Sequence, residues 1–289
     1  MRNSNKLYLA ILLAFALFVC WKIGAAYETE KLPDVPVSDE ELRESFPYLA
    51  LIPMDEGTEM TSPVRLDLSG RSNGYTITEA GEYHLTGELQ GSLVIDAPEQ
   101  NVHLFLDNVT ITARSGPAVY CQDANKFVIT LMPGTDNIIS DSGDYRADTE
   151  VEACIYSACD MTINGSGKLT VNGYYKDAIR SKDIVRILDG VYAIKCKRTA
   201  IHGTDGIVVK GGDFTISSEK VGLKSTKTGA QGRGNIIISG GEFSIIAGRY
   251  SFVTEKANLY IYDCAVYQRS VVSPYDVAGT LRVQEGCVQ

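Results

Sequence analysis

The chain has 289 residues, a formal net charge of −9 and 27 glycines. With 44% hydrophobic and 22% charged residues, its composition excludes a disordered chain and a protein with many membrane spans. The 36 acidic residues outnumber the 27 basic ones, so we expect no nucleic-acid partner, which would be bound through its phosphates.

The first 26 residues are typical of an export signal. An apolar run from Leu7 to Trp21 follows Arg2 and Lys6, and small residues lead to a cleavage point after Ala26. The run is shorter than the ~20 residues of a spanning helix, but an uncleaved N-terminal anchor is an alternative. We therefore expect a secreted or cell-surface protein, attached to a membrane only through this segment. Export would place the six remaining cysteines in an oxidising compartment, where they could pair.

Residues 27–63 are predicted to form a linker with a short helix. The segment contains five prolines, and Ser38–Glu41 resembles a capping box that opens one or two helical turns. The linker leads into residues 64–289, which we expect to form one β domain. Without the export signal, 24 basic and 36 acidic residues remain, so the exported part carries a formal charge of −12.

The β domain repeats a unit of about 22 residues. Turn residues recur near that spacing, with longer intervals that indicate loop insertions. These landmarks are Gly87, Asn108, Gly134, Gly167, Gly190, Gly212, Gly241, Cys264 and Gly286. Triplets beside them, such as Ile236–Ile238 and Phe243–Ile245, have large apolar outer residues and a variable middle one. That alternation is typical of strands with one face in a core.

The shared template favours a solenoid over a β-sandwich. Strands of a sandwich pair with distant partners and need no common template, whereas a coil that stacks on its own copy does. We predict an all-β parallel β-helix of about nine coils of ~22 residues, with a β-sandwich as the alternative. A last coil without a capping helix would expose backbone groups and permit end-to-end self-association.

Stacked coils would bring repeated carboxylates together. Asp183 and Asp205 occupy the same place in successive units, about 5 Å apart after stacking, and Asp177 flanks the same corner. Such carboxylates repel each other unless one is protonated, a cation binds or a basic side chain intervenes. Calcium, which takes six to eight oxygen ligands, is a candidate. Neutralisation by Lys182 or Arg180 is the alternative.

Tyrosines could present flat apolar faces to sugar rings. The alignment of the repeats puts Tyr260 and Tyr262 outward on one strand and Tyr267 outward on the next, while Tyr174 and Tyr175 lie in a turn. A contiguous set of exposed aromatic residues usually binds a ligand. The alternative is that tyrosine is common in strands for structural reasons alone.

Short motifs recur in a fixed order between about residues 65 and 262. They are Gly81–Tyr83, Leu85–Gly87, Leu104–Ile111, Ile129–Leu131, Gly134–Asn137, Ile155–Ser157, Thr162–Gly167, Asp177–Ile179, Ser181–Asp183, Gly211–Gly212 and Gly240–Gly241. In order and spacing they resemble a family of bacterial secreted β-helical carbohydrate-binding proteins, related in fold to pectate lyases. The resemblance implies a right-handed, calcium-containing parallel β-helix that binds plant-type polysaccharide, cellulosic or acidic pectic, without cleaving it.

The resemblance also implies where calcium would bind. The family's calcium positions correspond here to Asp177, Asp183 and Asp205, whereas the equivalent Thr199 and Val221 carry no carboxylate. Fewer calcium sites than coils are therefore expected.

The expected function is non-catalytic binding of polysaccharide outside the cell, with calcium bridging the acidic protein to an acidic sugar. A calcium-dependent polysaccharide (pectate) lyase is an alternative, in which Lys182 would be the base and Arg180 would assist. A structural or adhesive surface solenoid is a third interpretation.

Overall fold

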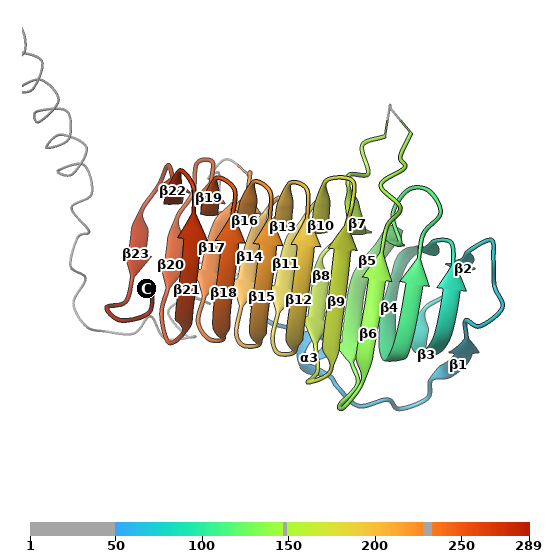
Figure 1. Ribbon diagram of the computed structural model, residues 1–289. Coiled ribbons are helices and arrows are strands. Elements are labelled where there is room, and N and C mark those ends of the chain that lie inside the picture. Colours follow the sequence, from blue (N-terminus) through green and yellow to red (C-terminus); the bar gives the residue numbers. More distant parts are fainter. Residues whose placement is uncertain (1–49, 147–148, 228–232) are drawn as a thin grey trace, which may run out of the picture. The chain divides into compact units, whose positions relative to one another are not determined.

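The computed structural model describes residues 50–146, 149–227 and 233–289. The predicted export signal and the capping box at Ser38–Glu41 lie outside these residues. Within them, one short helix, α3 (Pro53–Glu56), precedes 23 strands (Figure 1). None of the helical residues described forms a helix long and apolar enough to cross a bilayer.

The strands form three parallel ladders, which we name A, B and C. Ladder A contains β1 (Val64–Asp67), parts of β3 (Gly81–Gln90), β4 (Leu93–Thr112) and β5 (Val119–Leu131), then β8 (Met161–Asn164), β11 (Ile184–Ile187), β14 (Gly206–Val209), β17 (Asn235–Ile238), β20 (Leu259–Ile261) and β23 (Leu281–Val283). Ladder B contains the ends of β3 and β4, then β6 (Asp136–Ser140), β9 (Lys168–Gly173), β12 (Val191–Cys196), β15 (Asp213–Ser218), β18 (Glu242–Ala247) and β21 (Ala265–Ser270).

Ladder C forms the remaining side of each coil. It contains β2 (Tyr75–Ile77), the starts of β4 and β5, then β7 (Ala153–Ser157), β10 (Asp177–Ser181), β13 (Thr199–Gly203), β16 (Val221–Ser225), β19 (Tyr250–Thr254) and β22 (Ser273–Val277). Every full coil thus runs through ladders A, B and C in turn.

The predicted parallel β-helix is confirmed. The register pairs residues one repeat apart, as for Ile179, Ile201 and Leu223 in ladder C. Ladder A has ten strands among the described residues rather than the nine coils expected, because β1 precedes the first glycine landmark. A Cβ at Gly212, whose φ is +107°, would approach the carbonyl oxygen of Gly190 to 2.9 Å, so this corner needs glycine.

Inward side chains of the three ladders fill the interior with aligned rows. Tyr192, Phe214 and Phe243 stack on successive coils with ring centroids 4.7 and 4.3 Å apart and nearly parallel planes. Because equivalent residues repeat in register, outward side chains also stand in columns, about 4.8 Å apart from coil to coil. The core therefore sets the spacing of any site on the outer faces.

The segment before β1 packs on the outside of ladder A. Asp55 in α3 is fully buried and lies 2.5 Å from Nζ of Lys126, and the Thr162 hydroxyl donates to the same carboxylate. Burial opposes the charge of Asp55, but hydrogen bonds from the Ile52 amide, Lys126 and Thr162 outweigh it and lower its pKa. The amide of Asn164 donates to the Asp55 carbonyl oxygen at 2.7 Å. These contacts hold α3 against β5 and β8, on a different face of the coils from ladder C.

Candidate functional site

The outer face of ladder C contains a groove of about 380 Å³. Outward residues of β10, β13 and β16 line it, because the register places Arg180, His202 and Lys224 in one row. Neighbouring members of this row are about 4.8 Å apart, the distance between stacked strands.

A second row of basic residues stands at the corner where each coil enters ladder C. Lys176, Arg198, Lys220 and Arg249 each precede the first ladder residue of their coil, and we call them the basic column. Backbone hydrogen bonds link them along the stack: the Arg198 amide donates to the Lys176 carbonyl, and the Arg249 amide to the Lys220 carbonyl, both at 2.8 Å. The chain thus presents four cations in line on consecutive coils.

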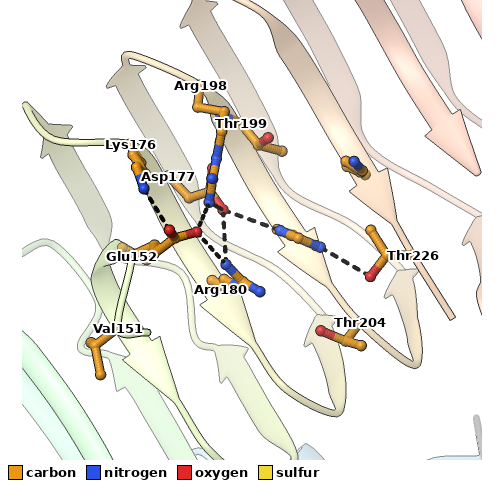
Figure 2. Close-up of polar contacts among 12 residues, drawn as sticks. Val151, Glu152, Lys176, Asp177, Arg180, Arg198, Thr199, Thr204 and Thr226 are labelled. Atoms are coloured by element: carbon orange, nitrogen blue, oxygen red, sulfur yellow. Dashed lines mark hydrogen bonds and ion pairs between the residues drawn. The ribbon is translucent and has the colours of Figure 1, made fainter. Parts of the chain in front are cut away.

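A buried carboxylate anchors the first half of the column. Asp177 has no exposed surface and accepts two bonds from Arg198, from Nε at 2.7 Å and from Nη2 at 2.8 Å (Figure 2). The backbone amide of Thr199 also donates to it, and His202 Nδ1 lies 3.1 Å away. Burial alone would raise the pKa of Asp177, but Arg198 and His202 outweigh that effect and hold the pKa at about 2.

His202 is held neutral in this environment. Burial lowers its pKa, and the opposing attraction of Asp177 does not restore it. A neutral imidazole can donate to a carboxylate only through its one N–H, so Nδ1 carries the proton and donates to Asp177. His202 Nε2 faces the Thr226 hydroxyl at 3.4 Å (Figure 2). His202 therefore orients the cluster and adds no positive charge to the groove.

Glu152 ties three basic residues together. Its carboxylate lies 2.5 Å from Lys176 Nζ, 2.8 Å from Arg198 Nη2 and 3.2 Å from Arg180 Nη1 (Figure 2). Burial opposes the charge of Glu152, yet Lys176 and Arg198 lower its pKa, so it stays ionised at neutral pH. Glu152 and Asp177 thus fix the directions of Lys176, Arg180 and Arg198.

The groove is locally positive although the chain is acidic. Counting Lys176 and Asp177 with the lining residues, six basic side chains face four acidic ones. The basic side chains are Lys176, Arg180, Arg198, Lys220, Lys224 and Arg249, and the acidic ones are Glu152, Asp177, Glu255 and Asp276. Lys224 pairs with Glu255 at 2.8 Å, but in the described part of the chain no ion pair involves Lys220 or Arg249, which are both exposed. The second half of the column is therefore available to an anionic ligand.

The three aspartates predicted as calcium ligands do not share one corner. Asp183 and Asp205 are stacked as predicted, since the Asp205 amide donates to the Asp183 carbonyl at 3.0 Å. Asp177 begins β10 whereas Asp183 follows its last residue, so the two lie at opposite ends of a strand, roughly 15 Å or more apart. The expectation that Asp177 flanks the corner of Asp183 is wrong, because a complete strand separates them.

Basic side chains neutralise two of these carboxylates, though not the residues expected. Asp205 pairs with Arg233 at 2.6 Å and Lys227 at 3.1 Å, and Arg198 is the principal partner of Asp177. Asp183 differs, because burial and the nearby charges of Asp160 and Asp205 raise its pKa.

This donor set does not fit a calcium ion bound by all three aspartates. Arg198, the Thr199 amide and His202 together place four donors on the two oxygens of Asp177, which leaves no lone pair for a metal. In the described ranges, no group of three or more His, Cys, Asp or Glu side chains is arranged to hold a metal ion. Calcium binding at the corner of the stacked Asp183 and Asp205 stays a prediction.

The five predicted tyrosines do not form one surface. Tyr260 belongs to ladder A and the exposed Tyr267 to ladder B, so neighbouring strands of the sequence lie on different sides of the coil. Tyr262 is wrong as an exposed residue: it packs with Ile184, Val208 and Ile237 and is only 7% exposed. The alternation predicts on which side of its own strand a side chain points, but it does not predict whether other residues cover that side.

Two of the predicted tyrosines lie beside the basic column. Tyr175 stacks on Tyr145 with centroids 4.2 Å apart, and Lys176 Nζ lies 4.8 Å from the centre of the Tyr175 ring. Tyr174 is 52% exposed at the same corner. Because Tyr145 and Lys176 cover the faces of Tyr175, the exposed Tyr174 ring is the one on which a sugar could stack at the Lys176 end of the basic column.

The residues predicted for a lyase do not act as a pair. Arg180 lies in the groove, bound to Glu152 and 3.9 Å from Asp177, whereas Lys182 is exposed at the corner after β10. A base that removes a proton next to a carboxylate must reach the same sugar as the group that stabilises the charge. The geometry does not bring Lys182 into the groove that Arg180 lines.

Sequence reasoning missed the basic column. Lys176, Arg198 and Lys220 follow one another at intervals of 22 residues, which is the base repeat, so the signal was present in the sequence. The repeats were aligned on the triplets around the glycine landmarks and on the segment that leads into ladder A. The corner where each coil enters ladder C, which carries the basic column, lies outside both. Glu152 gave no such signal, because it joins the cluster only through the stacking of coils.

A family model described as carbohydrate-binding domain-containing protein matches residues 71–267. The chain belongs to this family. A "Carbohydrate-binding domain-containing protein" of Acetivibrio thermocellus is 34% identical over 125 residues, which cover 41% of this chain and 44% of the relative. The match therefore spans less than half the length of that curated relative.

Among solved structures, the polysaccharide lyase-like protein from C. thermocellum, a gadolinium derivative, is similar to this chain with a TM-score of 0.74 and 27% identity. The similarity covers 78% of this chain and 98% of the other. The family is thus described by carbohydrate binding, and the similar structure by its likeness to polysaccharide lyases.

Proposed function

We propose that the chain binds an acidic polysaccharide along the groove on ladder C and does not cleave it. The basic column carries this proposal. It offers cations at one-coil intervals, and an extended polymer with regularly spaced carboxylates can contact several of them at once. Each contact is a charge-assisted hydrogen bond, which is stronger than a neutral one.

The local charge removes the main objection to such a ligand. An acidic chain repels a polyuronate at long range, but salt largely screens the repulsion between charges more than about 10 Å apart. The basic column, in contrast, acts on the ligand at contact distance. Calcium is then not required to bridge protein and sugar at this groove. The exposed ring of Tyr174 adds an apolar face for a sugar ring at the Lys176 end of the column.

The absence of cleavage follows from how the groove residues are held. Arg180 and His202 are each engaged with acidic partners, and His202 is buried. A base must be free to take a proton from the substrate. We therefore propose a binding role, and we place it outside the cell because of the predicted export signal.

The test compares two variants that remove the same charges from different faces. Lys220→Gln with Arg249→Gln removes the two cations of the column that form no ion pair with any described residue. Lys195→Gln with Arg269→Gln, on the outer side of ladder B, is the matched control. At about 1 kcal/mol for each lost contact, the first pair should weaken binding to polygalacturonate by roughly tenfold or more, and the control pair should not.

The ligands also supply controls. Fully methyl-esterified pectin has the same backbone without the carboxylates and should bind weakly to the unaltered protein. Equal retention of polygalacturonate by both double variants in affinity electrophoresis would refute the groove as the site. Retention of cellulose alone would instead favour a neutral ligand.

Two further measurements separate the alternatives. Binding is repeated with a chelator, because the related structure is a gadolinium derivative and lanthanide ions take the same hard oxygen ligands as calcium. Absorbance of unsaturated product is followed in the same samples. A rise that Lys182→Ala abolishes would establish a lyase and overturn the proposal.

A further inference from the structure

Two buried thiols lie side by side on neighbouring coils. Cys121, in the part of β5 that belongs to ladder C, and Cys159, in the corner before β8, have sulfur atoms 3.8 Å apart. Cys121 is fully buried and Cys159 is 9% exposed. The hydrogen bond to Cys159, and after it burial, raise the pKa of the Cys121 thiol well above its usual range.

Both cysteines depart from the residues that the other coils carry at the same places. In the coils that follow, the column of Cys121 continues as Ser157, Ser181, Gly203, Ser225 and Thr254, and in the preceding coil it contains Ile95. The hydroxyls of Ser157 and Ser181 donate to the Cys159 carbonyl at 2.8 and 2.7 Å, so this column normally fastens the corner by hydrogen bonds. The place of Cys159 is taken by Asp183 and Asp205 in the next two coils.

Two departures from a repeat that contact each other indicate a paired role. If either cysteine only filled space, its partner position would have no reason to be cysteine as well. Cys154 and Cys196 provide the contrast, because each is buried without a thiol partner among the described residues.

A second pair repeats the arrangement in the last described coils. Cys264 stands at the corner where preceding coils have glycine, as at Gly212 and Gly241, and Cys287 lies on the next coil. The backbone amide of Val266 donates to the Cys287 carbonyl at 2.6 Å, which fixes the two coils together at this point. Burial, and after it the neighbouring Cys287 thiol, raise the pKa of Cys264 to about 12.

We propose that Cys121–Cys159 and Cys264–Cys287 are two disulfide sites that covalently join successive coils. Each forms when the thiolate of one cysteine attacks a disulfide oxidant, such as glutathione disulfide or an exported dithiol oxidoreductase, and the partner thiolate then displaces the reduced oxidant. The two cysteine S–H bonds and the S–S bond of the oxidant are broken and one new S–S bond forms, while the two electrons and two protons of the cysteines pass to the oxidant, which leaves as two thiols. Because the thiols are buried, the reaction accompanies folding.

The first bond would act on the groove. The chain between Cys121 and Cys159 contains Glu152, which orients Lys176 and Arg198. A covalent closure of this segment restricts the unfolded chain and holds the coil that supplies Glu152. The second bond would restrain the coil that contains β22 and β23 against fraying.

The full chain is refolded with reduced and oxidised glutathione, denatured, alkylated and mapped without reduction. We expect linked peptides for Cys121–Cys159 and Cys264–Cys287, with Cys154 and Cys196 alkylated. Oxidation should raise the thermal midpoint by roughly 10–20 °C for the two bonds together. Linked peptides that contain Cys154 or Cys196 would overturn the proposal. So would free thiols at all four of the cysteines proposed to pair.

Two variants keep the test independent of misfolding. Cys121→Ser and Cys264→Gly restore the residues of the other coils, so both should fold with the reduced chain's midpoint. The double variant should lose the difference between oxidised and reduced midpoints, and Cys154→Ala should retain it. A difference that survives in the double variant would refute the role of these bonds.

Discussion

The replacement Asp177→Asn tests the electrostatic anchor of the groove. The amide has nearly the same shape as the carboxylate but no charge. It also has only one oxygen for donors that now occupy two, and its NH2 group would face Arg198 or His202. Arg198 would keep only Glu152 as a partner.

The magnitude follows from the pKa. Asp177 has a pKa of about 2 against an ordinary 3.8, and one pKa unit corresponds to about 1.4 kcal/mol, so its charge contributes about 2.5 kcal/mol. Because the folded pKa is lowered, this contribution is complete above pH 3.8 and is lost as the pH falls toward 2. With the penalty for an unpaired buried partner, Asp177→Asn should cost about 2–4 kcal/mol at pH 7.

Thermal unfolding at pH 7, 5, 3 and 2 is the assay. At pH 7 and 5 the midpoint of the variant should be roughly 5–10 °C lower, as expected for a domain of this size. The gap should narrow at pH 3 and narrow further at pH 2, because the wild-type carboxylate then becomes protonated. A constant gap across this range, or a variant as stable as the wild type at pH 7, would refute the charge-based reasoning.

Two other predictions concern the same coils. Asp183→Asn should leave the free energy of unfolding unchanged or raise it slightly at pH 7, because burial and neighbouring carboxylates raise the pKa of Asp183 and make its charge unfavourable. If calcium binds at Asp183, added calcium will raise the thermal midpoint of the wild type but not that of the variant. Phe243→Ala should lower the free energy of unfolding by about 3–5 kcal/mol in urea titrations, since it leaves a void beside Phe214, while the exposed Ile246→Ala should change it by less than about 0.5 kcal/mol.

The fold was predictable because one period controls both strand direction and stacking. Triplets such as Ile236–Ile238 carry the alternation of a strand, and their recurrence after one repeat requires the same partner on the next coil. The stacking of Asp183 on Asp205 followed from the same rule. Properties that repeat with the coil can therefore be read from the sequence.

The candidate site was less predictable because it depends on what lies between and across the repeats. Tyr262 alternates as an outward residue, yet Ile237 and Val208 pack against it outside the main core. Glu152 reaches Arg198 across 46 residues, and no local pattern announces that contact. The repeat period predicts which way a side chain points, but it does not predict which side chains from other coils or loops will contact it.

The unequal pairing along the basic column has a consequence for how a ligand binds. Lys176 and Arg198 already share Glu152, and Asp177 holds Arg198, so a ligand carboxylate there competes with bonds that exist. Lys220 and Arg249 are exposed, and no ion pair in the described residues holds them. An anion that binds Lys220 and Arg249 displaces no existing ion pair, so each contact with them is a gain. The polymer should therefore be held by its charge at Lys220 and Arg249, while the paired half of the column serves mainly to keep the groove rigid.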